Sequence, residues 1–224
     1  MYLHKISFAK DDLIKNRKTY QDIYALHKII WALVSQYKKQ KREFLYRVEY
    51  DAYQNIEFIY LLAPNQIISQ GNMVIAISPK FQPQLANGEN LYFKLRANPI
   101  IKRKGNGKAK EYSIVMDAKH QFNKKGQSYL EQFSLDELIY NVAMEWLDRK
   151  GEQHGFSVKQ FDVKIDNYRE YTVKAAGKEK FMLRTLDFEG KLNIADADQF
   201  KMALFSGIGS GKAFGCGLML VRRI

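Results

Sequence analysis

The chain is poor in the residues that build disulfides and metal centres. Among its 224 residues it has a single cysteine, Cys216, and four histidines. One cysteine excludes an intrachain disulfide and suits a reducing compartment, so we expect a cytoplasmic protein. No two histidines stand at metal-ligand spacing, and the acidic residues are scattered along the chain, which does not favour two-metal nuclease chemistry. We therefore expect no metal and no other cofactor.

Long apolar runs are missing as well. No stretch reaches the roughly 18 apolar residues that a transmembrane helix needs, so none is expected. Residues 1–6 show neither a long apolar run nor a cleavage pattern, and we expect no signal peptide. Hydrophobic residues still make up 46% of the chain, which is enough to bury one large core or two modest ones.

Negative charge is scarce compared with positive charge. The 36 Lys+Arg outnumber the 24 Asp+Glu, and the formal net charge is +12. Such an excess attracts phosphate backbones through Coulomb forces and counterion release, and it would also attract a membrane surface. The most basic run, residues 102–110, surrounds a Gly-Asn-Gly turn signal. We expect a projecting β-hairpin there that contacts nucleic acid, and its basic side chains are Lys102, Arg103, Lys104, Lys108 and Lys110.

Glycine is concentrated near the end of the chain. Residues 207–217 contain five of the 14 glycines together with Lys212. This is not a Walker A loop, because Ser206 replaces its first glycine and Ala213 follows the lysine. The loop is either a tight turn packed in a sheet or a loop that touches a polyanion, and the net charge favours the polyanion. The glycines concerned are Gly207, Gly209, Gly211, Gly215 and Gly217.

Hydrophobic periodicity predicts a βαββαβ unit in the first 90 residues. The predicted strands cover residues 2–8, 44–50, 56–62 and 74–78, and the predicted helices cover 21–36 and, weakly, 65–71. A second unit follows, with strands over 91–116 around the basic turn and a helix from Ser134 to near Gly151 that opens with a capping box. Its later elements are strands at 156–168 and 180–189, a helix over 196–206 capped by Asp196, and a closing strand over 214–221.

This order of elements is that of the ferredoxin-like fold, which RNA-binding domains also use. The sequence therefore predicts an α+β protein with two tandem ferredoxin-like domains. The predicted domains are residues 1–90, which carry the 21–36 helix, and residues 91–224, which carry the basic hairpin and the glycine-rich loop.

The predicted 21–36 helix holds the best-placed candidate catalytic group. At about 100° per residue its aliphatic side chains gather on one face, and Tyr24, His27 and Trp31 fall together at the edge of that face. A side chain at this border is held in place by the helix and the core, and it stays accessible to a substrate. The pKa of a histidine, about 6.5, suits proton transfer near neutral pH, whereas a tyrosine more readily orients a group. A Tyr-x-x-His pair at a helix edge is also a common packing feature, so a catalytic role and a packing role for Tyr24 and His27 both stay open.

RNA offers a reaction that matches these groups. Its 2′-OH can attack the adjacent phosphorus once it is aligned and deprotonated, and this releases a 2′,3′-cyclic phosphate and a 5′-OH. The reaction requires a base, an acid for the leaving oxygen and positive charge near the phosphorane, but no metal.

Several motifs occur together over the whole chain. They are Met-Tyr-Leu at residues 1–3, Tyr24-x-Leu26-His27-x3-Trp31, Leu-Tyr-Phe-Lys-Leu-Arg-Ala-Asn-Pro at 91–99, Phe188-Glu189-Gly190, and the glycine-rich loop ending in Gly215-Cys216-Gly217-Leu218. In this combination the chain resembles the CasE family of type I-E CRISPR systems, repeat-RNA endoribonucleases of the RAMP superfamily.

The resemblance implies two ferredoxin-like domains and metal-independent cleavage at the base of a repeat stem-loop in precursor CRISPR RNA. It implies that His27 is the catalytic histidine and Tyr24 its partner, and that the product RNA stays bound while the protein joins the surveillance complex. A functional lysine of the family falls on Lys174, Lys178 or Lys180, of which we choose Lys178. The expected RNA-binding residues are Arg96, Lys102, Arg103, Lys104, Lys108, Lys110, Lys174, Lys180 and Lys212.

A second hypothesis is a non-catalytic RNA-binding subunit of a ribonucleoprotein. It is favoured wherever the site is incomplete, and the sequence identifies no second acid or base beside His27.

Overall fold

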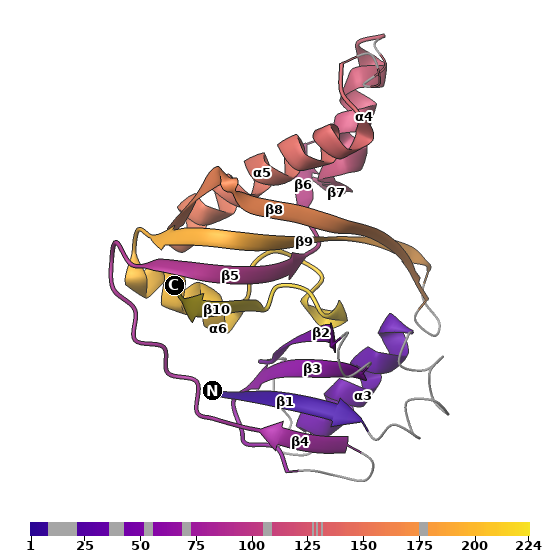
Figure 1. Cartoon of the computed structure of the whole chain (residues 1–224). Coiled ribbons are helices and arrows are strands. Elements are labelled where there is room, and N and C mark those ends of the chain that lie inside the picture. Colours follow the sequence, from indigo (N-terminus) through magenta and orange to yellow (C-terminus); the bar gives the residue numbers. More distant parts are fainter. Residues whose placement is uncertain are drawn as a thin grey trace.

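The computed structural model describes residues 1–8, 22–35, 43–51, 56–68, 73–104, 109–126, 128, 130, 132–174 and 179–224. Two antiparallel four-stranded sheets organise these residues, and Figure 1 shows the two sheets one above the other. The first sheet is built from residues 2–77 and the second from residues 90–223. The division of the chain at residues 90 and 91 stays a prediction.

The first sheet has the spatial order β2-β3-β1-β4. Its strands are β1 (Tyr2–Phe8), β2 (Leu45–Asp51), β3 (Ile56–Ala63) and β4 (Met73–Ile77). Helix α3 (Ile23–Ser35) covers one face of this sheet. Leu26, Ile30 and Leu33 of the helix are buried against a core that includes Ile6 and Ile59.

The second sheet has the order β10-β5-β9-β8. Its strands are β5 (Asn90–Ala97), β8 (Phe156–Val173), β9 (Phe181–Ile194) and β10 (Met219–Arg223). Helices α5 (Leu135–His154) and α6 (Ala197–Ser206) pack against it, with Trp146 and Phe200 in the shared core.

Both sheets have the same connectivity. In each unit the first strand pairs with the third and the fourth, and the second strand lies at an edge beside the third. This is the ferredoxin-like order, so the predicted fold class is confirmed.

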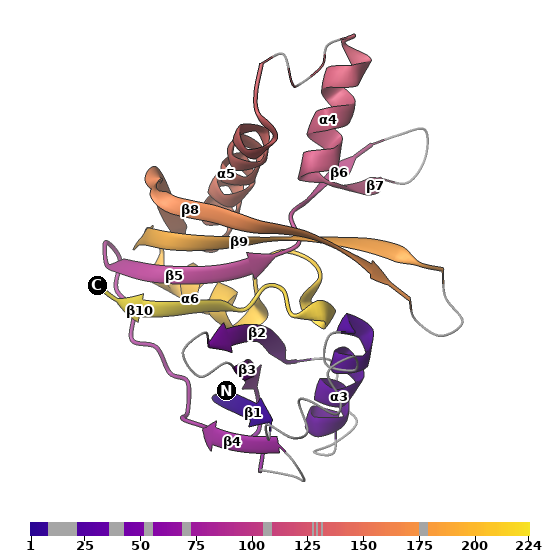
Figure 2. The same ribbon diagram turned by 45° about the vertical axis from the view of Figure 1, so that its right-hand side comes forward.

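The second unit carries an insertion between β5 and α5. A two-stranded hairpin, β6 (Ile100–Arg103) and β7 (Lys110–Ser113), leads directly into helix α4 (Ile114–Lys124). Figure 2 shows the hairpin and α4 standing away from the interface between the two sheets. The predicted basic hairpin is therefore present, and its tip, residues 105–108, lies outside the described residues.

The two units meet through the sheet face that α3 leaves uncovered. Leu45 and Leu62 of the first sheet are buried against Leu218, which precedes β10. Partly buried side chains from both units complete this contact, namely Met1, Leu3, Tyr60, Phe81, Phe205 and Leu220. The first sheet is thus held between α3 on one side and the second unit on the other.

Several predicted boundaries were wrong. The helix from Ser134 has the predicted capping box, but it runs through Gly151 to His154 and ends at Gly155, which has φ 73°. Gly151 is a packing position, because a Cβ there would overlap the carbonyl group of Phe156. The closing strand begins at Met219 instead of residue 214, since residues 212–214 form the 3₁₀ helix η2 (Lys212–Phe214).

Other differences concern helices. Residues 65–68 form no helix, and 69–71 lie outside the described residues. Helix α4 was not predicted, because its first residues, Ile-Val-Met, continue the apolar pattern expected of a strand. Strands β8 and β9 extend beyond the predicted ends, to Val173 and Ile194. Among the described residues, no helix combines the length and the apolar character needed to cross a membrane.

Gly190 provides a test of the packing between β8 and β9. A Cβ at this position would overlap the backbone of Asp162, where the pairing of the two strands shifts register. We expect Gly190→Ala to lower the free energy of unfolding by about 1–3 kcal/mol, the usual effect of overpacking. Urea unfolding measures this change.

The matched control is Gly88→Ala. Gly88 has φ +80° and open space around its Cα, so the control reports backbone strain without crowding, about 1–2 kcal/mol. A Gly190→Ala protein as stable as the parent would contradict the packing argument.

Candidate active site and nucleic-acid interface

The start of α3 positions the candidate catalytic residues. The carboxylate of Asp22 accepts hydrogen bonds from the backbone N–H groups of Tyr24 at 2.8 Å and Ala25 at 3.1 Å. This cap fixes the first turn of the helix. With the aliphatic side chains turned inward, Tyr24 and His27 are half-buried at the border of the core, as the periodicity predicted.

The ring of His27 lies among aromatic side chains. Its centroid is 6.2 Å from that of Trp31 on the same helix and 5.8 Å from that of Phe214 in η2. The Nδ1 atom of His27 is buried. The fold therefore brings together two motifs, the histidine helix and the glycine-rich loop, that are almost the whole chain apart. Sequence reasoning treated the two motifs separately.

Close packing explains the glycines of residues 207–217. All five have positive φ, and an added Cβ at Gly207 would lie 2.7 Å from Leu45 Cδ2. At Gly215 it would lie 3.3 Å from the ring of Tyr46. The hydroxyl of Tyr46 donates to the Ala213 carbonyl at 2.9 Å, so the first sheet holds the loop directly.

The loop is thus a tightly packed turn at the boundary between the units. A tight, packed turn was one of the two interpretations that the sequence left open. Lys212 donates a hydrogen bond through Nζ to the Ser206 carbonyl at 2.7 Å, at the C-terminal end of α6. RNA contact by Lys212 and by these glycines stays a prediction.

A charged cluster links the units beside this loop. Arg96 makes two 2.8 Å hydrogen bonds to the carboxylate of Asp187 and donates to the Val48 carbonyl at 3.0 Å. Arg47 Nη2 lies 3.8 Å from Asp187 Oδ1. Burial by itself raises the pKa of Asp187, but the bonds and charge of Arg96 outweigh it, and the pKa is lower than usual. Arg96, predicted to bind RNA, is therefore engaged within the protein, and its RNA contact stays a prediction.

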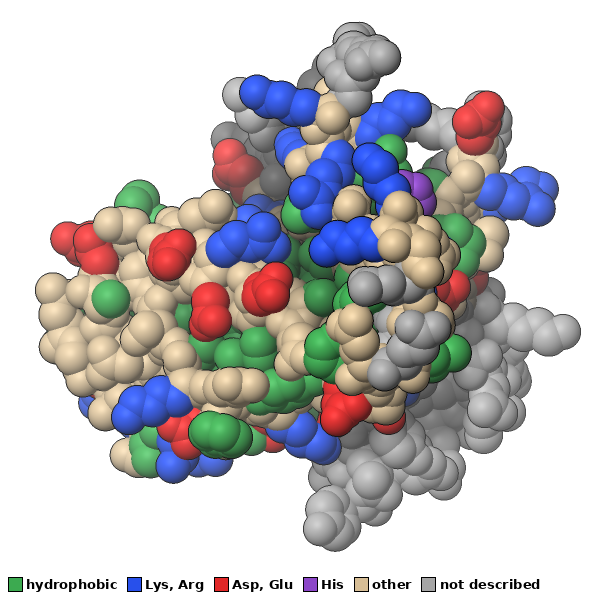
Figure 3. All heavy atoms as spheres, turned by 90° about the horizontal axis from the view of Figure 1, so that it is seen from above, with side chains coloured by type: hydrophobic (Ala, Val, Ile, Leu, Met, Phe, Trp, Pro, Cys, Tyr) green, Lys and Arg blue, Asp and Glu red, His purple; other side chains and the backbone are tan. Residues whose placement is uncertain are grey.

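The basic hairpin presents most of its charge to solvent. Lys104 and Lys110 are exposed, and Lys102 Nζ lies 3.5 Å from Glu111. Arg103 forms two hydrogen bonds with Asp117 of α4, at 3.0 and 2.6 Å, which lower the pKa of that carboxyl group. Figure 3 shows Lys and Arg side chains gathered over the region of α4 and this hairpin. Lys108 lies outside the described residues.

Two of the three candidate lysines of residues 174–180 flank the paired ends of strands β8 and β9. Lys174 and Lys180 are exposed, and Lys178 lies outside the described residues. Phe181, next to Lys180, has its ring centroid 5.5 Å from that of Phe214, the side chain that also contacts His27. Phe181, at the start of β9, therefore contacts the same aromatic side chain, Phe214, that contacts His27.

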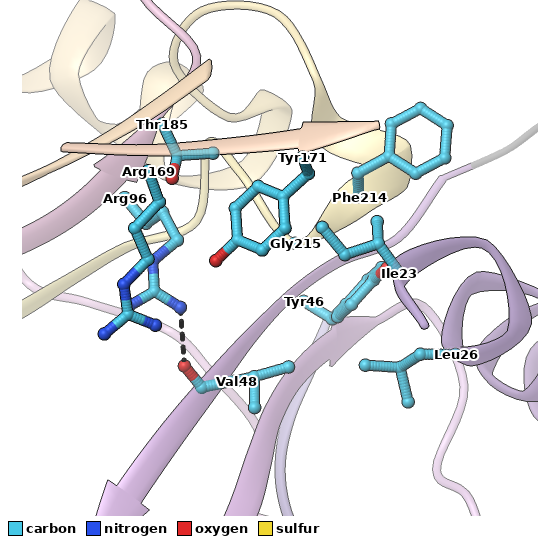
Figure 4. A pocket seen from close by; sticks show the side chains of 10 residues that line it. All are labelled: Ile23, Leu26, Tyr46, Val48, Arg96, Arg169, Tyr171, Thr185, Phe214 and Gly215. Carbon is cyan, nitrogen blue, oxygen red and sulfur yellow. Dashed lines mark hydrogen bonds between the residues drawn. The ribbon is translucent and has the colours of Figure 1, made fainter. Parts of the chain in front are cut away.

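A pocket of about 290 Å³ opens between the units next to α3. Figure 4 shows side chains from α3 and β2 facing side chains from β8, β9 and the glycine-rich loop. Sequence reasoning missed Arg169, Tyr171 and Thr185, which line this pocket. The available signal was the alternation of Arg169 and Tyr171, which places both side chains on one face of a strand.

The other three histidines have other surroundings. His4 is fully buried, its ring nitrogens contact the Ser78 hydroxyl and the Asn65 carbonyl, and burial lowers its pKa. His120 lies exposed on α4. His154 is the last residue of α5. His27 is therefore the histidine that the fold places at the boundary between the units.

The chain is similar in sequence and in fold to known proteins. The family described as "CRISPR associated protein" matches residues 1–223. The chain belongs to this family. It is 28% identical over 219 residues to the CRISPR system Cascade subunit CasE of Escherichia coli, a match that covers 98% of both chains. It is 26% identical over 221 residues to the CRISPR-associated endoribonuclease Cse3 of Thermus thermophilus, which covers 92% of both.

A solved structure supports the fold of this family member. It is that of Thermus thermophilus Cse3 bound to an RNA representing a pre-cleavage complex, and it matches with a TM-score of 0.73 and 22% identity. The match covers 99% of this chain and 98% of that one. The resemblance found in the sequence motifs is confirmed at the level of family and fold.

The Asp187 cluster makes stability depend on pH. Because the pKa of Asp187 is depressed in the folded protein, its contribution is complete above the pKa of the unfolded chain, about 4, and is lost as pH falls through the folded pKa. We expect Asp187→Asn to lower the free energy of unfolding at pH 7 by about 3 kcal/mol, since it leaves half-buried Arg96 without its carboxylate. The difference should shrink as pH falls below about 4.

Urea unfolding of parent and variant between pH 2 and pH 7 provides the measurement. Glu111→Gln, which removes an exposed ion pair, is the control and should change stability by less than about 1 kcal/mol. A stability difference that stays constant over the whole pH range would contradict the assignment.

Proposed function

We propose that the chain is a metal-independent endoribonuclease that binds the repeat stem-loop of precursor CRISPR RNA and cuts at its base. It then keeps the product RNA as a subunit of a cytoplasmic surveillance complex. The observation that carries the proposal is the position of His27, held against Phe214 where the two units and the β8–β9 ribbon meet. Family membership supports it, as do relatives named endoribonuclease and Cascade subunit.

The proposed reaction is attack by the substrate's own hydroxyl. The 2′-oxygen forms a bond to phosphorus while the bond from phosphorus to the 5′-oxygen breaks. A proton leaves the 2′-OH and another reaches the departing 5′-oxygen. His27 transfers one of these protons, and Nε2 is the ring nitrogen we assign to this role because Nδ1 is buried.

Two further groups support this step in the proposal. Tyr24 precedes His27 by one helical turn and orients the substrate through its hydroxyl. The Nζ atom of Lys28 lies 5.2 Å from the centre of the Tyr24 ring, which adds positive charge beside the site. One lysine among Lys174, Lys178 and Lys180 stabilises the charge on the phosphorane.

The RNA stem is proposed to lie on the basic surface formed by α4 and the β6–β7 hairpin (Figure 3). Its phosphates would contact the exposed lysines of the hairpin. The Thermus thermophilus relative, which has the same fold, is described as bound to RNA in a pre-cleavage complex.

The alternative is a non-catalytic RNA-binding subunit. One observation favours it: His27 is half-buried and Phe214 packs on its ring, so the substrate reaches the ring only at the uncovered edge. A cleavage assay separates the two functions, because only an enzyme yields a discrete shorter RNA with a cyclic phosphate end.

His27→Ala tests the catalytic assignment. We expect the single-turnover rate of repeat-hairpin cleavage in EDTA to fall by at least about 10²–10⁴-fold, the usual contribution of a general acid–base group. Binding should stay within about tenfold, or about 1.4 kcal/mol. The readouts are mass analysis of the RNA ends and a binding titration. His154→Ala, at the last residue of α5, should cleave at the parent rate, and parent-like cleavage by His27→Ala would refute the assignment.

A double variant, Lys102→Gln with Lys104→Gln, tests the hairpin. Each lost phosphate contact should lower the slope of log affinity against log salt by about 0.7–0.9, so the slope should fall by about 1–2. The matched control changes Lys191 and Lys201, exposed lysines on β9 and α6, and should leave the slope unchanged. Equal slopes for the hairpin variant and the parent would place the stem elsewhere.

A further inference from the structure

The pocket between the units lies directly behind the candidate histidine's aromatic neighbour. Phe214 lines the pocket and also contacts the ring of His27, with centroids 5.8 Å apart. The pocket volume is about 290 Å³. Sites for drug-sized ligands usually start at about 300 Å³, so this one is of the size for a single small planar group.

Strand β8 supplies two polar groups to the pocket. A register shift between Asp166 and Arg169, with Asn167 at φ 54°, sets the following residues so that Arg169 and Tyr171 face the pocket. Glu170, between them, is bonded to Arg184 at 2.7 Å on β9. Among the described residues, neither the guanidinium of Arg169 nor the hydroxyl of Tyr171 has a hydrogen bond or an ion-pair partner.

A third polar group is the hydroxyl of Thr185. This residue is only 2% exposed, yet it lines the pocket from β9. Arg96 also lines the pocket, but its guanidinium is already bonded to Asp187 and to the Val48 carbonyl, the second of which Figure 4 shows. The pocket therefore offers two hydroxyl groups and one uncommitted positive charge.

The remaining lining of the pocket is mostly apolar and includes aromatic rings. Figure 4 shows the rings of Tyr171 and Phe214 along one side, with Tyr46, Leu26 and Ile23 opposite. Aromatic faces bind unstacked nucleobases, and hydroxyl groups can read the edge of a base. A fully apolar ligand would leave both hydroxyls unpaired, and a phosphate by itself would leave the aromatic faces uncovered.

We infer that this pocket binds one unpaired nucleotide of the RNA, next to the phosphodiester that is cut. The base lies against Tyr171 and Phe214, its edge meets the hydroxyls of Thr185 and Tyr171, and Arg169 contacts its phosphate. Removing this base from the stack aligns the neighbouring 2′-OH for attack beside His27. The inference rests on the proposed endoribonuclease function and adds a site that selects the nucleotide at the cut.

The test combines abasic RNA with pocket variants. Repeat hairpins carry an abasic residue at each of the two nucleotides that flank the cut, and single-turnover cleavage is measured. With the parent protein, one abasic position should slow cleavage about tenfold or more, the effect of losing one stacked base. Tyr171→Phe/Thr185→Val keeps the aromatic ring and removes both hydroxyls. Cleavage of the intact RNA by this variant should already be slower, and the same abasic position should cost the variant less than it costs the parent, because the contacts to the edge of the base are lost in both cases.

Two arginine variants separate a contact in this pocket from a general loss of positive charge. Arg169→Gln should weaken cleavage of the intact RNA and of the abasic RNA alike, whereas Arg149→Gln, at an exposed arginine of α5, should match the parent. Both variants replace an exposed arginine with a shorter polar side chain, so we expect both to fold like the parent. Thermal unfolding of Tyr171→Phe/Thr185→Val confirms that it is folded.

The outcomes are distinct. If the parent cuts the intact hairpin but the abasic residue slows parent and pocket variant by the same factor, the pocket does not hold that base and the inference falls while the nuclease stands. If the parent does not cut the intact hairpin, the proposed function falls and this inference falls with it.

Discussion

The close approach of the glycine-rich loop to the first sheet is the contact on which the candidate site depends. The backbone at Gly207 and Gly215 fills space next to Leu45 and Tyr46 that a side chain could not enter. The Tyr46 hydroxyl then fixes the loop through the Ala213 carbonyl. This packing places Phe214 on the ring of His27, so the surroundings of the histidine are set by the interface between the units and not by its helix.

Two groups of basic residues in the described part of the chain have different surroundings. Arg47 and Arg96 lie at the interface, where Asp187 compensates them and their charge serves the docking of one unit on the other. The described lysines of the β6–β7 hairpin are exposed, and Figure 2 shows the hairpin and α4 away from the first sheet. Net charge therefore indicates an anionic partner, but the fold decides which basic residues remain available to it.

Prediction from the sequence was most accurate where a local rule applies. Residues close in the chain determine four features that were predicted: the capping box at Ser134, the Asp196 cap, the basic hairpin and the edge position of His27. Prediction failed where the packing of a segment distant in the sequence determined a boundary or a residue choice. Gly151 was taken as a helix end because glycine often stands there, but it is required inside α5 by the neighbouring strand β8.

The sequence by itself determined the order of elements, the two repeated units, the excess of positive charge and the group suited to proton transfer. These follow from hydrophobic period, capping residues and side-chain chemistry, which act over a few residues. Tertiary structure alone decided that the loop of Gly215 meets the helix of His27, that Arg96 turns inward, and that Arg169, Tyr171 and Thr185 share a pocket. The physical reason is that these contacts join segments far apart in the chain, and their geometry is set by how two sheets pack together, which no local pattern encodes.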